Sequence, residues 1–208
     1  PMRPSLKSCL VFLLLFSFAP FLTAAPSQPL ASFAKVKGKV EVRQKGKTAR
    51  LATQGSTASA GQRIVVGKGA EATLRFFEGS ELRLNPGSDI TVTRLGRSGE
   101  DNNLKFKLWA GKLLAKVRKL ASPRSSFEIE AGGVVCGVRG TEYSVDYDPD
   151  TDKLDLFVVE GEVWASSGSD TFQYGPGSHG TFIDGHPEGP AAPGGADHGT
   201  PPSREREA

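Results

Sequence analysis

Residues 70–92 read AEATLRFFEGSELRLNPGSDITV, and they contain three short stretches in which apolar and polar residues alternate. The stretches are 72–76, 81–84 and 89–92, and the turns between them carry Gly79 and Gly87. Alternation with a period of two predicts half-buried strands, because successive side chains of a strand point to opposite faces of a sheet. Residues 39–42 alternate in the same way, and glycines suited to turns recur through most of the chain. The sequence therefore predicts an all-β fold.

A weak internal repetition bears on the architecture. Gly79-Ser-Glu-Leu-Arg-Leu is followed eight residues later by Gly87-Ser-Asp-Ile-Thr-Val, and Gly38, Gly111 and Gly161 each stand two positions before an apolar residue. Similar successive units favour a solenoid-like (β-helix-like) or rolled β architecture, in which each unit covers the edge of its neighbour. Any β protein with many glycine turns gives such an echo, so the repetition alone does not decide the architecture.

Residues 104–120 permit two interpretations. Their apolar residues fall at helical spacing against a basic background, which is typical of a helix lying on a membrane surface. They also alternate with lysines on either side of Gly111, which favours two strands joined by a turn. A glycine inside a helix costs about 1 kcal/mol relative to alanine. We therefore expect strands here.

The beginning of the chain has the layout of a secretory signal. Arg3 and Lys7 precede an uncharged apolar run, residues 10–22, that is short for a membrane span. We expect a signal peptide over residues 1–27, cleaved after Ser27, with a retained membrane anchor as the alternative. Residues 28–184 are then expected to form one domain, and the Pro- and Gly-rich segment 185–208 a disordered tail. The mature protein would be periplasmic or secreted, in a Gram-negative type of envelope.

Several blocks of residues, in a fixed order, resemble the FecR domain family. They are Gly38-Lys-Val-Glu-Val, Gly61-Gln-Arg-Ile-Val-Val-Gly, residues 70–88, Leu108-Trp-Ala-Gly-Lys-Leu-Leu-Ala, Gly137-Val-Arg-Gly-Thr-Glu-Tyr-Ser-Val and Val158-Val-Glu-Gly-Glu-Val-Trp-Ala. The resemblance covers about residues 35–182. It implies a non-enzymatic recognition, sensing or scaffold module of the periplasm or cell surface. Sigma-factor regulators of this family carry further domains, for which we expect no room here, so a free-standing binding protein is the better expectation.

The family signature is the most specific of these blocks, and we expect its role to be structural. It consists of Val138, Arg139, Gly140, Thr141, Glu142 and Tyr143. A strand bent at the glycine would pack Val138 and Tyr143, while Arg139 and Glu142 would pair with each other or cap neighbouring carbonyls. The alternative is that Arg139 faces a ligand.

We expect no catalytic residue, no cofactor and no metal centre. His179, His186 and His198 lie at or beyond the end of the expected domain, and a nucleophile needs a nearby base. Cys9 lies in the signal, and Cys136 is expected to be a small buried apolar residue rather than a reactive thiol. The acidic run between Asp146 and Asp155 does not match a helix–loop–helix calcium loop, and its proline indicates a hairpin turn. The sequence leaves cation binding by this loop open.

Charge is divided unevenly along the chain. Residues 28–125 contain 20 Lys and Arg against 7 Asp and Glu, whereas residues 126–184 contain 2 against 12. The basic half could bind an anionic envelope polymer or a lipid headgroup. Alternatively, the two halves neutralise each other across neighbouring strands. The expected partner is an envelope protein or an anionic polymer, without nucleic acid, and with membrane contact only through an uncleaved signal.

Overall fold

The computed structural model describes residues 30–120 and 122–189. These residues form 16 strands and no helix, so the all-β prediction is confirmed. Within the same ranges there is accordingly no helix that could span a membrane. The expected signal peptide lies outside the described residues, as does most of the expected tail.

The strands follow one another with short connections. In chain order they are β1 Ala31–Lys37, β2 Val40–Gln44, β3 Arg50–Leu51, β4 Gln62–Val66, β5 Glu71–Phe76, β6 Glu81–Leu84, β7 Asp89–Ser98, β8 Asp101–Lys116, β9 Ser126–Ala131, β10 Val134–Val138, β11 Glu142–Asp148, β12 Lys153–Glu160, β13 Val163–Ser167, β14 Asp170–Tyr174, β15 His179–Ile183 and β16 His186–Pro187. The last of these pairs with β15, so strand structure extends into the first residues of the expected tail.

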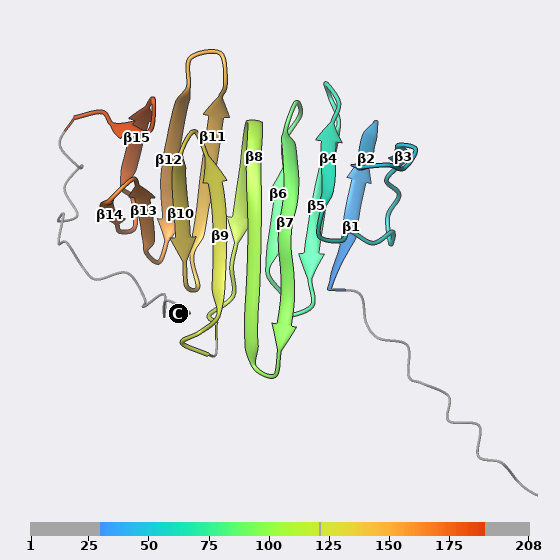
Figure 1. The fold of residues 1–208 in the computed structure, drawn as a ribbon, viewed down its shortest axis with the longest axis horizontal. Helices are drawn as coiled ribbons and strands as arrows, with labels where there is room; N and C mark the ends of the chain where they lie inside the picture. The colour runs from blue at the N-terminus through green and yellow to red at the C-terminus, as the bar shows by residue number, and fades with distance from the viewer. Residues whose placement is uncertain (1–29, 121, 190–208) are drawn as a thin grey trace, which may run out of the picture.

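The strands make one open sheet that folds into two layers joined through β8 (Figure 1). Layer A has the order β1-β5-β6-β8-β11-β12-β15-β16. Layer B has the order β3-β2-β4-β7-β8-β9-β10-β13-β14. The chain alternates between the layers as it advances, so β1–β4 lie at one end of the long axis and β13–β15 at the other.

The expected solenoid-like, β-helix-like winding is not confirmed. Stacked rungs of a β-helix pair in parallel, whereas here β8 and β9 form the one parallel pair among the described strands. Glycine turns of a few residues explain the difference, because such short connections join antiparallel neighbours and parallel neighbours need a longer crossover. The repetition in the sequence reflects the changes of layer, where Gly38, Gly87, Gly111 and Gly161 lie, together with the hairpin turn at Gly79.

The strand β8 carries the chain from one layer to the other. Residues 101–110 pair in layer B with β7, and residues 111–116 pair in layer A with β11. Gly111 stands at the crossing with a φ of 85°, and a Cβ there would lie 2.9 Å from the Cα of Ser88. Glycine is the residue that tolerates both conditions. The helical alternative for residues 104–120 is therefore wrong, and the expected turn is a bend within one strand.

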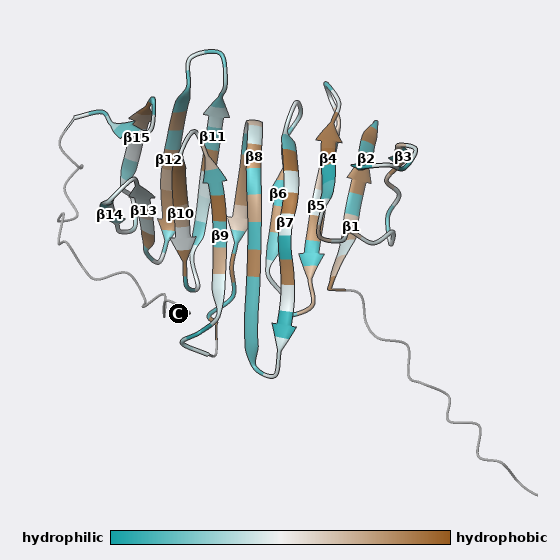
Figure 2. Cartoon of the chain, in the orientation of Figure 1, coloured by the Kyte–Doolittle hydropathy of each residue, from teal (hydrophilic) through white to brown (hydrophobic). Residues whose placement is uncertain are grey.

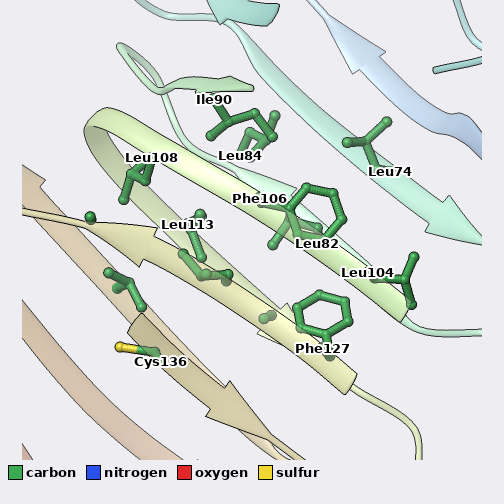
Figure 3. Close-up of a cluster of buried hydrophobic side chains, with 14 of the residues drawn as sticks. Leu74, Leu82, Leu84, Ile90, Leu104, Phe106, Leu108, Leu113, Phe127 and Cys136 are labelled. Atoms are coloured by element: carbon green, nitrogen blue, oxygen red, sulfur yellow. The ribbon is translucent and has the colours of Figure 1, made fainter. Parts of the chain in front are cut away.

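The hydrophobic core fills the space between the layers. Alternating apolar and polar residues along strands such as β7 and β8 place one set inward (Figure 2). Phe76 of layer A contacts Phe106 and Phe127 of layer B, with ring centroids 5.3 and 6.0 Å away. Figure 3 shows Phe106 and Phe127 within this core. Burying one such side chain contributes about 1.5–3 kcal/mol, so the core fixes the relation of the two layers.

Candidate functional site

The signature residues lie where the chain passes from layer B to layer A. Strand β10 ends at Val138 and β11 begins at Glu142. Val138, Thr141 and Tyr143 are buried. The Thr141 hydroxyl donates a hydrogen bond of 2.8 Å to the carbonyl oxygen of Glu162, which precedes β13. This hydrogen bond connects the β10–β11 crossing, which contains the signature, to the β12–β13 crossing.

The expected charge pair between Arg139 and Glu142 is wrong. The Glu142 carboxylate lies 3.0 Å from Nζ of Lys116, its neighbour in the register of β11 and β8. This hydrogen bond raises the pKa of Lys116. Arg139 forms no ion pair or hydrogen bond with the other described residues. The change of layer separates the two residues, because Arg139 leaves β10 whereas Glu142 already faces outward from layer A.

The aromatic residue of the signature serves packing. The side chain of Tyr143 is fully buried, and its hydroxyl has no hydrogen-bond partner among the described residues. Burial raises the pKa of Tyr143 well above its usual value, and the neighbouring Cys136 and Glu128 add to this. The phenol therefore stays neutral, and proton transfer through it has no path among the described groups.

Cys136 is held as a protonated thiol. It lies on β10 with its side chain in the core (Figure 3). Burial raises the pKa of Cys136 to about 12, whereas a nucleophilic cysteine needs its thiolate. His179 stands instead on the outer face of layer A, with 57% of its side chain exposed. The two groups lie on opposite faces of their layers and do not form a nucleophile–base pair.

The outer face of layer A carries two hollows on either side of the β8–β11 pair. One has a volume of about 210 Å³ and is lined by Lys112, Ser144, Asp146, Asp155, Leu156, Phe157 and His179. The other, of about 310 Å³, is lined by Lys35, Thr73, Glu81, Arg83, Leu114, Lys116 and Glu142. The strand registers align seven of these residues in one line, which we call the outer row: Lys35, Thr73, Arg83, Leu114, Ser144, Phe157 and His179.

The charges around the first hollow are fixed by one another. Asp155 accepts a hydrogen bond of 2.8 Å from Thr181 and lies 3.1 Å from Lys153 and 3.6 Å from His179. Its burial would raise the pKa of Asp155, but the hydrogen bonds from Thr181 and Lys153 outweigh burial and lower it. Phe157 stands among these charges with 43% of its surface exposed. An apolar centre within a charged rim suits binding.

The acidic run forms the hairpin turn between β11 and β12. Asp148 accepts hydrogen bonds of 3.0 Å from the amide of Asp150 and from the hydroxyl of Thr151. Tyr147 donates to Asp152 at 2.7 Å, and burial together with this bond raises the pKa of Tyr147 to about 12. These carboxylates stabilise the turn. Within the described part of the chain, no three acidic, His or Cys residues gather as a metal site would require.

The two halves of the charge distribution meet along β8. Lys105 and Lys107 lie 3.1 and 3.2 Å from Glu130 of β9, and Lys112 lies 3.7 Å from Asp146 of β11. The halves thus neutralise each other at this seam. Away from it the charge stays segregated: residues 30–69, the basic end, hold 9 Lys and Arg and one Glu, whereas residues 140–189, the acidic end, hold 11 Asp and Glu and one Lys.

The family model described as FecR protein matches residues 62–164, which run from β4 into β13 and include the signature. This chain contains a FecR domain. Such domains are regulatory rather than enzymatic modules. No curated protein gives a significant sequence match.

The FecR domain also has structural neighbours. Two crystal structures of a candidate anti-sigma factor from Parabacteroides distasonis ATCC 8503, at 1.65 and 2.50 Å resolution, each give a TM-score of 0.51. They are 14% and 15% identical in sequence, and the match covers 61% of this chain and 57% and 56% of theirs. The chain therefore spans little more than half the length of these neighbours, and the likeness shows a shared fold.

The outer row was not predicted from the sequence. One signal was present in β12, where residues 156–159 read LFVV and interrupt the alternation. Strict alternation would place polar residues at Phe157 and Val159, which are 43% and 48% exposed. An apolar run in a strand with one solvated face predicts an apolar patch on that face.

Proposed function

We propose that this protein is an exported recognition and sensing module of the periplasm or cell surface, which binds an envelope protein through the outer face of layer A. The observation that carries the proposal is the exposed Phe157 between the charged residues of the first hollow. The FecR match and the signal-like start of the chain support it.

The outer row has the composition of a small protein interface. Aromatic side chains often supply most of the binding energy of an interface when a partner covers them, and a polar rim excludes water around them. Phe157 and Leu114 supply the apolar part, and the fixed charges of Lys112, Asp146 and Asp155 would orient the partner. The row lies on rigid strands, so binding requires no ordering of a loop.

The partner-binding test uses two exposed apolar residues on different faces. The purified protein and its variants Phe157→Ser and Leu51→Ser are immobilised and exposed to an envelope fraction at low salt. Leu51 is the control, because it is 61% exposed but lies on β3 in layer B. We expect a retained protein whose binding falls at least tenfold for Phe157→Ser only. Equal retention by both variants, or no retained protein, would contradict the proposal.

Export is tested separately. Cells that produce the full chain are fractionated, and the amino terminus of the product is determined by mass spectrometry. The proposal requires an envelope or extracellular product that begins near Gln28. A cytosolic product that retains Arg3 and Lys7 would contradict it.

The basic end favours a second candidate function, the binding of an anionic envelope polymer or lipid headgroup. It contains nine exposed cations and a single acidic residue, Glu41. The probes are soluble polyphosphate, and vesicles with or without phosphatidylglycerol. Binding through exposed charges must weaken steeply with salt. It must also weaken in the variant Lys37→Glu, Lys45→Glu, Lys47→Glu, but not in the control Arg94→Glu, Arg118→Glu, Lys119→Glu. Salt-independent binding would reject this candidate.

A further inference from the structure

Most of the acidic end has no role in the two proposed functions. The first hollow uses Asp146, Asp155 and Phe157, and an anionic polymer would occupy the basic end alone. The acidic end nevertheless carries a charge comparable in size and opposite in sign to that of the basic end. Strands β1–β4 of the basic end and β13–β15 of the acidic end lie at opposite limits of the long axis (Figure 1).

Much of the charge at both ends has no partner within the described residues. At the basic end, Lys35, Lys37, Lys45, Lys47 and Lys68 are exposed and form no ion pair there. At the acidic end the same holds for Glu162, Asp170, Asp184 and Glu188. The charges at the β8 seam are therefore a separate set, and those at the ends are free to meet another surface.

Both ends also present open sheet edges. At the basic end, β1 pairs with β5 and β3 with β2; at the acidic end, β14 pairs with β13 and β16 with β15. On its other side, β1 is bonded through Ala31 and Phe33 to the backbone of residues 55–58, so only its end near Lys37 is open. The other three strands meet no further described strand on that side. Unpaired backbone groups at an edge can accept a strand from another chain.

The charges decide which edges can meet. Lysines on an edge repel a second lysine-rich edge, which is how many proteins avoid self-association. Two basic ends or two acidic ends of this chain therefore repel each other. A basic end and an acidic end attract each other, and each brings unpaired edge groups to the contact.

We propose that copies of this protein associate head to tail, with the basic end of one copy against the acidic end of the next. The partner is a second copy because the two ends of this chain are opposite in charge, and each has an unpaired strand edge to offer the other. A heterologous contact of this kind does not give a symmetric dimer; it produces a row of copies, either open or closed into a ring. Such a row presents the outer face of layer A once in every copy. A partner with repeated binding sites would therefore bind the row with higher avidity than a single copy.

The test separates the two ends by charge reversal. One variant, with Lys37→Glu, Lys45→Glu and Lys47→Glu, has a disabled basic end. A second, with Glu162→Lys, Asp170→Lys and Glu188→Lys, has a disabled acidic end. The matched control reverses three exposed cations in the middle of the body, Arg94→Glu, Arg118→Glu and Lys119→Glu. All proteins are purified from the envelope fraction and followed by sedimentation velocity over a range of concentrations.

We expect the unaltered protein and the control to form oligomers at about 0.01 M salt and to be monomeric at about 1 M, since the Debye length falls from about 30 Å to about 3 Å. Each end variant alone should stay monomeric, with a dissociation constant at least tenfold higher. An equimolar mixture of the two should associate again, because the intact ends attract each other and the two reversed ends are also opposite in charge.

Three results would overturn the proposal: an unaltered protein that is monomeric at low salt, an end variant that still self-associates, or a mixture that stays monomeric. Association only when polyphosphate is added would also overturn it, and would assign the basic end to a polymer. The mixture serves as the folding control, because unfolded variants could not recover salt-dependent association on mixing. Loss of binding by Phe157→Ser leaves this outcome unaffected, so the two proposals can fail independently.

Discussion

Gly161 packs against Gly140 so closely that a Cβ on Gly161 would lie 2.7 Å from the carbonyl oxygen of Gly140. Gly140 belongs to the crossing from β10 to β11, and Gly161 to the crossing from β12 to β13. The hydrogen bond from Thr141 to the carbonyl of Glu162 joins the same two segments. The signature and the block at residues 158–165 thus meet backbone to backbone and hold the layers together.

Replacing Gly161 by alanine should destabilise the protein strongly. The residue has a φ of 84°, and the new methyl group would also meet the backbone of Gly140 and Thr141. Backbone strain and the clash together should lower the free energy of unfolding by about 2–4 kcal/mol in urea denaturation. Gly133→Ala is the control, because its φ is 74° but no atom lies within 4 Å of the added Cβ. Equal losses in both variants would show that the contact is unimportant.

Removing the hydroxyl of Tyr143 should not destabilise the protein. This hydroxyl is buried without a partner among the described residues, and an unsatisfied buried polar group costs about 1–3 kcal/mol. We expect Tyr143→Phe to leave the free energy of unfolding unchanged or to raise it by about 1 kcal/mol, while Tyr143→Ala lowers it by about 3–5 kcal/mol. A marked loss of stability in Tyr143→Phe would reveal a hydrogen bond that the phenol makes.

The alternation of residues was sufficient to predict the strands but not their arrangement. Leu82 and Leu84 point inward because the period of a strand is two, and this holds whichever layer the strand joins. The placement of β9 beside β8, with Glu130 next to Lys107, depends on pairing between residues distant in sequence. The bend at Gly111 was likewise predicted as a break, although it keeps one strand continuous. Local periodicity shows neither which distant strands pair nor whether a strand continues through a glycine.

The candidate site was less predictable than the fold. The signature was recognised by its residues, but the pairing expected for Arg139 required knowledge of the layer change that follows it. Phe157 lines a hollow because β11, β12 and β15 bring Ser144 and His179 beside it. Each of these residues is ordinary in its own strand. A site assembled across a sheet from several strands leaves little trace in any one of them.

Cys136 should react with thiol reagents only after unfolding. Its side chain has no exposed surface, and burial raises the pKa of Cys136 to about 12, so the thiolate that reacts is scarce. The test uses Cys9→Ser, which leaves Cys136 as the one thiol of the chain. We expect no labelling in native buffer over hours and complete labelling in denaturant. Rapid labelling of the native protein would contradict the buried position and reopen a role for the thiol.

The carboxylate of Glu130 should stabilise the protein at neutral pH and lose this effect in acid. Burial would raise the pKa of Glu130, but hydrogen bonds from Lys105 and Lys107 outweigh burial and lower it. A lowered pKa in the folded state means that the unfolded chain binds the proton more readily. The contribution is therefore complete above the ordinary glutamate pKa and is lost as the pH falls through the lowered value.

Glu130→Gln should accordingly cost about 0.5–1 kcal/mol at pH 7, as for a partly exposed pair, and less at pH 3. The measurement is urea denaturation of both proteins at the two pH values. Glu100→Gln is the control, because Glu100 is exposed and forms no ion pair with a described residue. Its denaturation curve should coincide with that of the unaltered protein at each pH. If the cost for Glu130→Gln were absent at pH 7 or larger at pH 3, the ion pairs between β8 and β9 would not stabilise this seam.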